Sequence, residues 1–223
     1  AAHEFGHNLG LWHANYWNTS GESTTGSGTN AEYGNSFDTM GSASAGNYWF
    51  NAGHQQQLQW MPAENVTQVQ ASGVYRLVQF DQPRIDPASR YLLSIAKDSE
   101  RDYWCELRQR WTTNKWLTSG VALNWGPWGD SATDNTAYGS NGGSQLLDST
   151  PGSPDGKDDS AVVLGRTFSD HRAGIHITPL AKAGTVPESV DVAVNIGTFP
   201  GNHAPALSLS AGTLTAAVNE SVT

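Results

Sequence analysis

The sequence predicts an α+β fold in which two short helices precede an antiparallel β region. Apolar residues recur at helical spacing in two stretches of the first 61 residues, and the period changes to strict alternation from Val66 onward. Charged residues make up 15% of the 223 residues, and Gly, Ser, Asn and Thr are abundant. This composition suits strands joined by turns better than it suits a helical bundle.

The first helix is expected to be short and to begin at the start of the chain. Phe5, Leu9 and Leu11 alternate with polar positions, as on a helix with one apolar face. Gly10 can take the positive φ of a C-cap, so we expect the helix to end there. The chain should then turn sharply.

A loop and a second helix are expected next. Residues 18–47 are rich in Gly, Ser and Thr, and we expect them to form an ordered loop without regular structure. A helix is predicted from about residue 48 to residue 60, with Phe50 and Leu58 near one face. Pro62 should stop it, because proline cannot continue a helix.

The β region consists of alternating apolar and polar runs separated by turn residues. They occupy residues 66–70, 74–80, 90–96, 102–111, 120–125, 161–165, 174–180 and 189–196. Residues 90–111 are predicted to form a hairpin with a polar connection, and Cys105, the only cysteine, is expected in the core. We predict antiparallel pairing throughout.

Three domains are predicted from these patterns. The first covers residues 1–62, and the second is an antiparallel β-sandwich-like domain over residues 63–200. A junction that contains proline then leads into a fresh alternating pattern. Residues 201–223 are therefore expected to be the start of a truncated Ig- or cadherin-like β domain.

Charge and hydropathy exclude two classes of partner. The formal net charge is −9, from 21 acidic and 12 basic residues, so no basic stripe is available to neutralise a phosphate backbone. We therefore expect no nucleic-acid partner. No apolar run approaches the roughly 20 residues of a membrane span, so we expect none.

The stretch HEFGHNLGLWH, residues 3–13, carries the chemistry. His3 and His7 are four residues apart on the predicted helix, so both imidazoles can face one metal ion. Glu4 lies beside that ion, where it can take a proton from water. A turn at Gly10 would bring His13 to a third ligand position, and three imidazoles leave the fourth position of a tetrahedral zinc open, as in catalytic sites.

Chance is a weak explanation for this pattern. A lone H-E-x-x-H can occur by accident on a polar helix, but the match here extends to H-E-x-x-H-x-x-G-x-x-H. Three of the seven histidines fall within eleven residues, and a glycine stands where the backbone must turn. The pattern favours a zinc site over a structural role for these residues.

The extended motif resembles the signature of the metzincin zinc peptidases. SFDTMGSAS, which contains Met40, resembles the Met-turn of that clan. EYGNSFDTMG followed by FNAGHQQQLQWM is similar to the gametolysin family and its secreted bacterial relatives. The resemblance covers most of residues 1–200 and is most specific in the first 41. It implies that residues 1–62 are the C-terminal part of a peptidase catalytic domain.

The resemblance implies a zinc-dependent endopeptidase that acts on protein or peptide substrates. In that case His3, His7 and His13 bind zinc, Glu4 is the general acid/base and Met40 is the Met-turn residue. It also implies an extracellular, secreted protein whose signal peptide is not in this chain. Because two residues precede the first histidine, we expect the N-terminal half of the catalytic domain to be missing and the piece alone to be inactive.

One position departs from a pattern found in part of the clan. Some metzincins have a tyrosine two residues after the methionine, but that position is Ser42 here. A transition-state donor would have to come from elsewhere. Asp38 is expected to tie the turn together through backbone hydrogen bonds.

Several other features have alternative interpretations. The acidic loop at residues 155–160 offers oxygen ligands for calcium, but its spacing is not that of an EF-hand and Lys157 interrupts it, which favours a solvated turn. The remaining histidines have no partners at ligand spacing and are expected to be structural or surface residues; they are His54, His171, His176 and His203.

A non-catalytic function is the alternative hypothesis. Four tryptophans lie in or beside predicted strands and could form a platform for sugar rings or protein, as in an extracellular adhesion or carbohydrate-binding module. These are Trp111, Trp116, Trp125 and Trp128. Packing of the same residues in the core is the expected arrangement.

Overall fold

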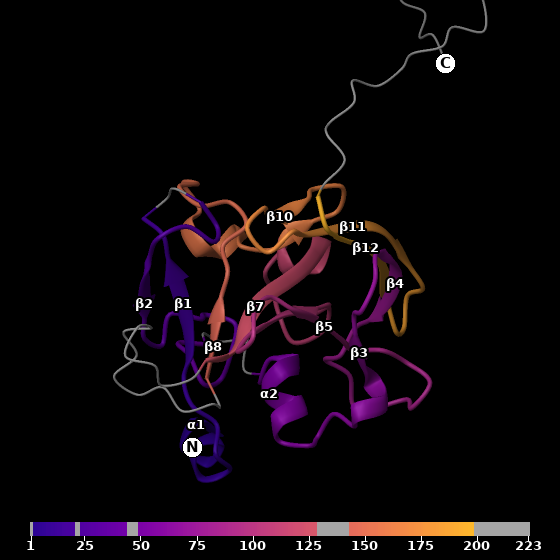
Figure 1. Cartoon of the computed structure of the whole chain (residues 1–223). Helices are drawn as coiled ribbons and strands as arrows, with labels where there is room; N and C mark the ends of the chain where they lie inside the picture. The colour runs from indigo at the N-terminus through magenta and orange to yellow at the C-terminus, as the bar shows by residue number, and fades with distance from the viewer. Residues whose placement is uncertain (1, 21–22, 44–48, 129–142, 199–223) are drawn as a thin grey trace, which may run out of the picture.

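The computed structural model describes residues 2–20, 23–43, 49–128 and 143–198, and these form a mixed α+β structure made mostly of two β-sheets (Figure 1). This confirms the predicted fold class. The helices are α1 (Ala2–Asn8) and α2 (Ala52–Gln57), and 3₁₀ turns cover Ala63–Asn65, Leu117–Ser119 and Gly156–Asp159. The expected third domain, residues 201–223, lies outside the described residues.

The larger sheet has eight strands in the order β2-β1-β8-β7-β6-β5-β3, with β9 paired to β7. Its strands are β1 (Ala14–Asn18), β2 (Thr29–Ala31), β3 (Val66–Gln68), β5 (Leu92–Ala96), β6 (Asp102–Glu106), β7 (Gly120–Trp128), β8 (Gly143–Leu146) and β9 (Val162–Val163). The predicted hairpin is β5–β6, in which Leu93 pairs with Cys105 and Ala96 with Asp102.

The smaller sheet has four antiparallel strands in the order β10-β11-β12-β4. They are β4 (Gly73–Val78), β10 (Phe168–Asp170), β11 (Ile175–Ala183) and β12 (Ser189–Ile196). Its central pair, β11–β12, contains a register shift between Pro179 and Ala181. Apolar residues alternate along β12, where Val190, Val192 and Val194 are fully buried.

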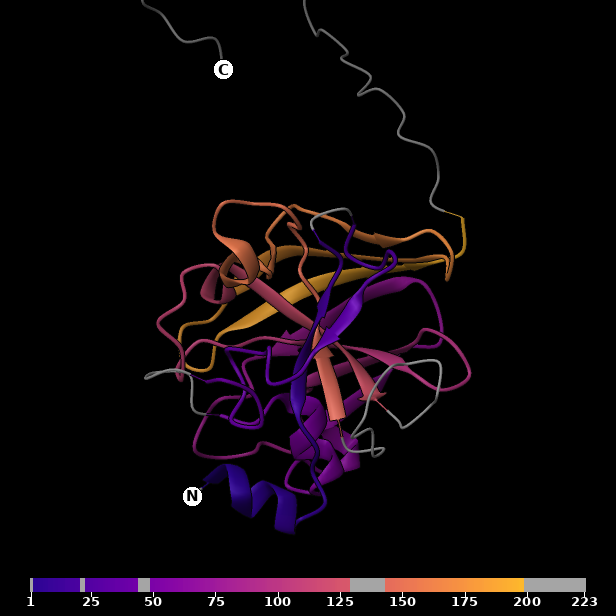
Figure 2. The same cartoon turned by 90° about the vertical axis from the view of Figure 1, so that its left-hand side faces the viewer.

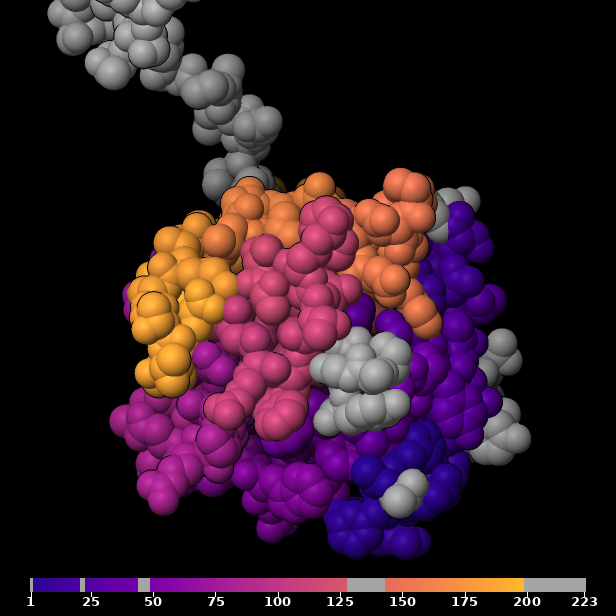
Figure 3. Space-filling model, turned by 180° about the vertical axis from the view of Figure 1, so that it is seen from behind, coloured from indigo at the N-terminus to yellow at the C-terminus, as the bar shows by residue number. Residues whose placement is uncertain are grey.

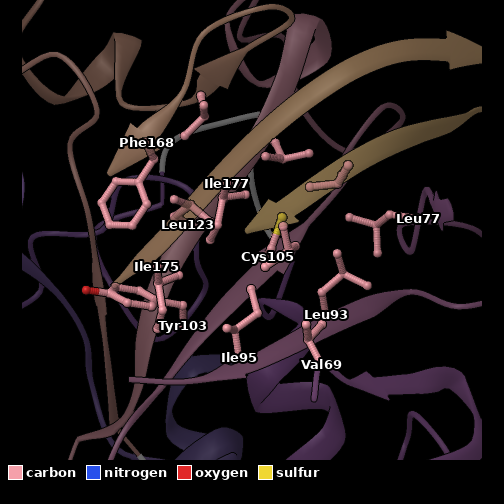
Figure 4. Packing of buried hydrophobic residues seen from close by; sticks show 14 of the residues in the cluster. Val69, Leu77, Leu93, Ile95, Tyr103, Cys105, Leu123, Phe168, Ile175 and Ile177 are labelled. Atoms are coloured by element: carbon pink, nitrogen blue, oxygen red, sulfur yellow. The ribbon is translucent and has the colours of Figure 1, made fainter. Parts of the chain in front are cut away.

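The main core lies between the two sheets (Figure 4). Leu93, Ile95 and Cys105 from the larger sheet pack in one cluster with Ile175 and Ile177 from the smaller one. Cys105 is 0% exposed, as the sequence predicted. Burial raises the pKa of its thiol far above the ordinary value, so it is an inert core residue.

Each of the eight runs predicted as a strand contains one, but four strands and the uniform antiparallel pairing were not predicted correctly. The missed strands are β1, β2, β8 and β10, and β2 lies inside the segment expected to be an irregular loop. In addition, β1 pairs parallel with β8 and β3 pairs parallel with β5. The four missed strands read ANYWN, TNA, GSQL and FSD, so none of them shows the alternation of apolar and polar residues that indicates a strand.

The first helix lies where it was predicted, but Phe5 and Leu9 of its expected apolar face are exposed, and the second helix is shorter than predicted. α1 is followed by a turn in which Gly10 has a φ of 90° and the Leu11 N–H donates to the Gly6 carbonyl at 3.0 Å, a Schellman-type ending. α2 begins after Asn51, whose side chain accepts from the His54 N–H at 2.8 Å. It ends before Gln59, which has a φ of 58°.

The larger sheet crosses the predicted boundary between residues 62 and 63. β1 and β2 come from the first 62 residues, yet Ala14, Asn15 and Tyr16 of β1 pair with β8. The predicted boundary therefore does not separate two sheets. Through this pairing, β1 and β2 belong to the same sheet as the strands of the β region.

The helix α1, which carries His3 and His7, lies at one end of the molecule. Figure 2 shows α1 below α2 and the strands, at the end opposite the four-stranded sheet, with β1 running from beside α1 toward that sheet. In the view from behind, the first residues occupy one lower corner of the surface (Figure 3). Among the described residues, none of the helices has the length and apolar character needed to traverse a bilayer.

Candidate metal centre

The structure brings the three histidines of the motif together. His3 and His7 lie on α1, and His13 immediately precedes β1. One nitrogen of each imidazole lies within 4.8 Å of those of the other two. Within the described residues, this is the single group of three or more His, Cys, Asp or Glu side chains that could hold an ion.

Hydrogen bonds on the outer side of each ring identify the nitrogen that is free to bind a metal. Nδ1 of His3 lies 2.8 Å from the Thr39 carbonyl, and Nδ1 of His7 lies 3.0 Å from the Leu11 carbonyl. Because a carbonyl oxygen only accepts, each Nδ1 must carry the proton. In the neutral form of such a ring, Nε2 is unprotonated and its lone pair is available to an ion.

His13 has the same arrangement with a carboxylate in place of the carbonyl. Its Nδ1 lies 2.8 Å from Oε1 of Glu32, which follows β2. Burial lowers the pKa of His13; the hydrogen bond and charge of Glu32 oppose this shift, and His7 and His3 add to it. The neutral imidazole is the form that binds metal.

The three residues fit a zinc ion by these criteria. Zinc takes imidazole nitrogens at about 2.0–2.1 Å, so tetrahedral ligands lie about 3.4 Å apart. The three nitrogens lie within 4.8 Å of one another, which is close to that spacing. The protonated Nδ1 atoms, each with its own acceptor, are the outer-shell arrangement that metal-binding histidines have.

Met40 lies directly beneath the helix that carries His3 and His7. It is 0% exposed, and a Cβ added at Gly6 of α1 would overlap its sulfur. Its carbonyl accepts from the Ala14 N–H at 2.9 Å, next to His13. The one residue therefore supports the helix with its side chain and the third histidine with its backbone.

Buried polar groups hold the loop that carries Met40. Asp38 is 0% exposed, and its carboxylate accepts from the Met40 N–H and the Asn51 N–H, both at 2.6 Å. Nδ1 of His54, also fully buried, lies 3.3 Å from Asp38. Asp38 thus ties the turn together through backbone hydrogen bonds, as predicted, and His54 is a buried structural residue.

Glu4 and Ser42 both have exposed side chains near this centre. Glu4 lies in the first turn of α1 and makes no hydrogen bond or ion pair with any described residue. Its carboxylate is therefore exposed to solvent and unpaired within the described part of the chain. Ser42 follows the Met40 turn, and its backbone N–H donates to the Asn35 carbonyl at 3.0 Å.

The other predicted residues do not form a second site. Asp155, Asp158 and Asp159 are not part of any ion-holding group in the described part of the chain. Trp125 is 4% exposed and packs in the core, whereas Trp111 is 43% exposed and stacks on Trp49 at 5.5 Å.

These burial values argue against one flat tryptophan platform. Trp116 is half-buried in a separate cluster, and the side chain of Trp128 lies outside the described residues.

The remaining histidines do not join the candidate metal centre. His176 is 1% exposed, and its ring lies 5.4 Å from that of His171. His203 lies outside the described residues.

Two residues beside the metal centre were missed in the sequence. Glu32 contacts His13 across 19 residues of chain, and Tyr33 places its ring centroid 3.9 Å from that of His13. The letters EYG contain no spacing that would indicate either contact. Only the pairing of β1 with β2 brings them to the site.

The fold and the site together define a β-rich protein with a three-imidazole centre at one end. Comparison with protein-family models, with curated proteins and with solved structures found no match.

Proposed function

We propose that this protein is a zinc-dependent endopeptidase of the metzincin type, similar to the gametolysin family. The observation that carries the proposal is the set of three convergent histidines, each with its Nδ1 hydrogen-bonded outward to an acceptor. A helix that carries H-E-x-x-H and a buried methionine beneath it supports the same assignment.

In this proposal each residue has a defined role. His3, His7 and His13 hold the ion, which when bound supplies Lewis-acid activation of water and of the scissile carbonyl. Glu4 takes a proton from the attacking water and delivers it to the departing amine. The exposed position of its side chain is consistent with both steps.

The same proposal includes the division of the chain into domains, the substrate class and the location of the protein. Residues 1–62 would be the C-terminal part of the catalytic domain and residues 63–200 a sandwich-like β domain, with β1 and β2 of the first part joined to the larger sheet of the second. The substrate would be a protein or peptide, and the protein would be secreted.

Substitution of Glu4 and His7 tests the mechanism. Glu4→Gln should bind zinc like the parent, because Glu4 is not a ligand, yet lose about 10²–10⁴-fold in kcat/KM. His7→Ala should lose both zinc and activity. Zinc content is measured by metal analysis after dialysis, and peptidase activity is measured on the natural full-length protein.

A control variant and two contrary outcomes complete this test. Glu64→Gln, at an exposed carboxylate in the Ala63–Asn65 turn, should change neither zinc content nor activity. Undiminished peptide hydrolysis by Glu4→Gln would rule out its role as general acid/base. Parental zinc content in His7→Ala would rule out the metal site.

A further inference from the structure

The third histidine differs from the other two in how its position is held. His3 and His7 share α1, whose backbone sets their spacing. His13 lies in the irregular segment between Gly10 and β1, so no helix orients its ring. Backbone hydrogen bonds hold the main chain at this point, since the Ser144 N–H donates to the His13 carbonyl at 3.2 Å, and the orientation of the ring depends on the side chains that touch it.

Trp12, the preceding residue, stacks on the His13 ring at 5.6 Å and 19°, and two residues that follow β2 make further contacts. Glu32 accepts from Nδ1 of His13 at 2.8 Å and restrains the ring at one edge. Tyr33 covers one face of the same ring, with centroids 3.9 Å apart and an interplanar angle of 37°. The Tyr33 ring also stacks on His3 at 5.7 Å and 27°.

The backbone of Tyr33 is in a conformation that an aromatic residue rarely adopts. Its φ is 58°, in the left-handed region where a Cβ is crowded by the carbonyl oxygen. Glycine takes this conformation without strain, yet the glycine of this turn is the next residue, Gly34, whose φ is not positive.

The surroundings hold Tyr33 in this strained state. Its N–H donates to Oδ1 of Asn15 on β1 at 3.0 Å, and the Gly34 N–H donates to the Ala31 carbonyl at 3.0 Å. The side chain is 43% exposed, so burial of apolar surface does not account for a tyrosine here. Strained residues of this kind cluster at functional sites.

We propose that Tyr33 is a positioning residue of the metal centre, whose ring clamps His13 and His3 in the orientation that binds the ion. This inference rests on the proposed zinc site. The β1–β2 hairpin then serves as the support of the third ligand, and the strain at Tyr33 is retained because it places the ring over both imidazoles.

Two substitutions at Tyr33 separate positioning from stability. Tyr33→Asn removes the ring but suits the backbone, because asparagine tolerates the left-handed region. The zinc dissociation constant should rise on the order of tenfold, as for other outer-shell changes, while the melting temperature of the metal-free protein stays at least as high as that of the parent. Tyr33→Phe keeps the ring and should match the parent in both.

The measurements are chelator competition for zinc affinity, the visible spectrum of the cobalt-substituted protein and thermal unfolding of the metal-free protein. Tyr33→Asn should alter the cobalt bands, since the third imidazole is no longer held in place, and Tyr33→Phe should not. Val186→Asn, at an exposed position in the β11–β12 turn, is the matched surface control.

The possible contrary results distinguish a failure of the Tyr33 proposal from a failure of the metal site. Parental zinc affinity in Tyr33→Asn would overturn the proposal, as would an affinity loss accompanied by a comparable loss of metal-free stability. An equal loss in Tyr33→Phe would show that the hydroxyl, and not the ring, is responsible. If the parent itself binds no zinc, the proposed metal site fails, and this inference fails with it.

Discussion

Asp38 shows how a single buried carboxylate can organise the loop beneath the metal centre. It receives the N–H groups of Met40 and Asn51 and pairs with His54, all of which are buried. Burial alone would raise the pKa of Asp38, but the charge and hydrogen bond of His54 and the two backbone N–H groups hold it below the ordinary value. Ionised Asp38 is therefore the form that stabilises the fold.

The sign of this shift predicts acid lability. A carboxyl whose pKa is lower in the folded state contributes stability above its unfolded pKa of about 3.9, and the contribution is lost as the pH falls through the folded value. Asp38→Asn should lower the free energy of unfolding at pH 7 by about 1–3 kcal/mol and flatten its decline below pH 4. Urea unfolding between pH 3 and pH 7 measures both effects.

A carboxylate on the surface provides the control for the Asp38 substitution. Asp158 is exposed, so Asp158→Asn should leave the acid dependence nearly unchanged. The explanation would be refuted if Asp38→Asn kept the same decline below pH 4 as the parent.

At the scale of elements, α2 depends on β6 for its position. The helix has six residues, too few to be stable alone. The Ala52 N–H at its start donates to Oε2 of Glu106 on β6 at 2.6 Å, and a Cβ at Gly53 would overlap the Trp104 ring. The strand thus supplies both a hydrogen-bond acceptor and a packing surface for α2.

A buried ion pair extends this support to the Met40 loop. Arg108, 1% exposed, lies 2.8 Å from Oε1 of Glu106, and its second terminal nitrogen donates to the Phe37 carbonyl. Burial raises the pKa of Glu106, and the Arg108 guanidinium acts against that rise. One pair of side chains therefore connects the sheet, α2 and the segment that leads to Met40.

Loss of Arg108 should be costly. Arg108→Ala leaves Glu106 buried without its partner and should lower the free energy of unfolding by about 3–5 kcal/mol. Zinc affinity should fall as well, because the Phe37 anchor of the Met40 loop is lost. Urea unfolding and chelator competition measure the two effects.

The exposed pair Arg76–Asp191 is the matched control for this prediction. Its guanidinium and carboxylate lie 2.5 Å apart on the surface, where water screens them. Arg76→Ala should therefore reduce stability far less than Arg108→Ala. Equal losses in the two variants would contradict the importance of the buried pair.

At the scale of the whole molecule, the strand pairing joins the metal centre to the main core. β1 begins beside His13 and pairs with β8, which pairs with β7. Leu123 and Trp125 of β7 belong to the cluster between the two sheets. The strand that follows His13 and the strands that line the main core therefore share one sheet.

This continuity predicts a single unfolding transition that responds to metal. Zinc at about a thousand times its dissociation constant should raise the free energy of unfolding by about 4 kcal/mol, since it binds the folded state alone. Far-UV circular dichroism and tryptophan fluorescence should shift together, and removal of zinc with a chelator should reverse the shift. Two transitions, only one of them sensitive to zinc, would instead support independent domains that meet near residue 62.

Local features of the structure could be predicted from the sequence. The i, i+4 spacing of His3 and His7 determines that both lie on one helix face, and Gly10 supplies the positive φ that ends the helix. The alternating runs at residues 174–180 and 189–196 likewise predicted strands where β11 and β12 lie. These predictions succeed because each depends on the geometry of a few consecutive residues.

What the sequence alone determines about this protein is thus the helix with its histidines, the turn after it and the longer strands. Only the tertiary structure decided that β1 pairs with β8, that Glu32 and Tyr33 meet His13, and that Arg108 supports the loop before Met40. The physical reason is distance along the chain, because contacts between remote segments depend on how whole strands pair, and no local period of residues encodes that choice.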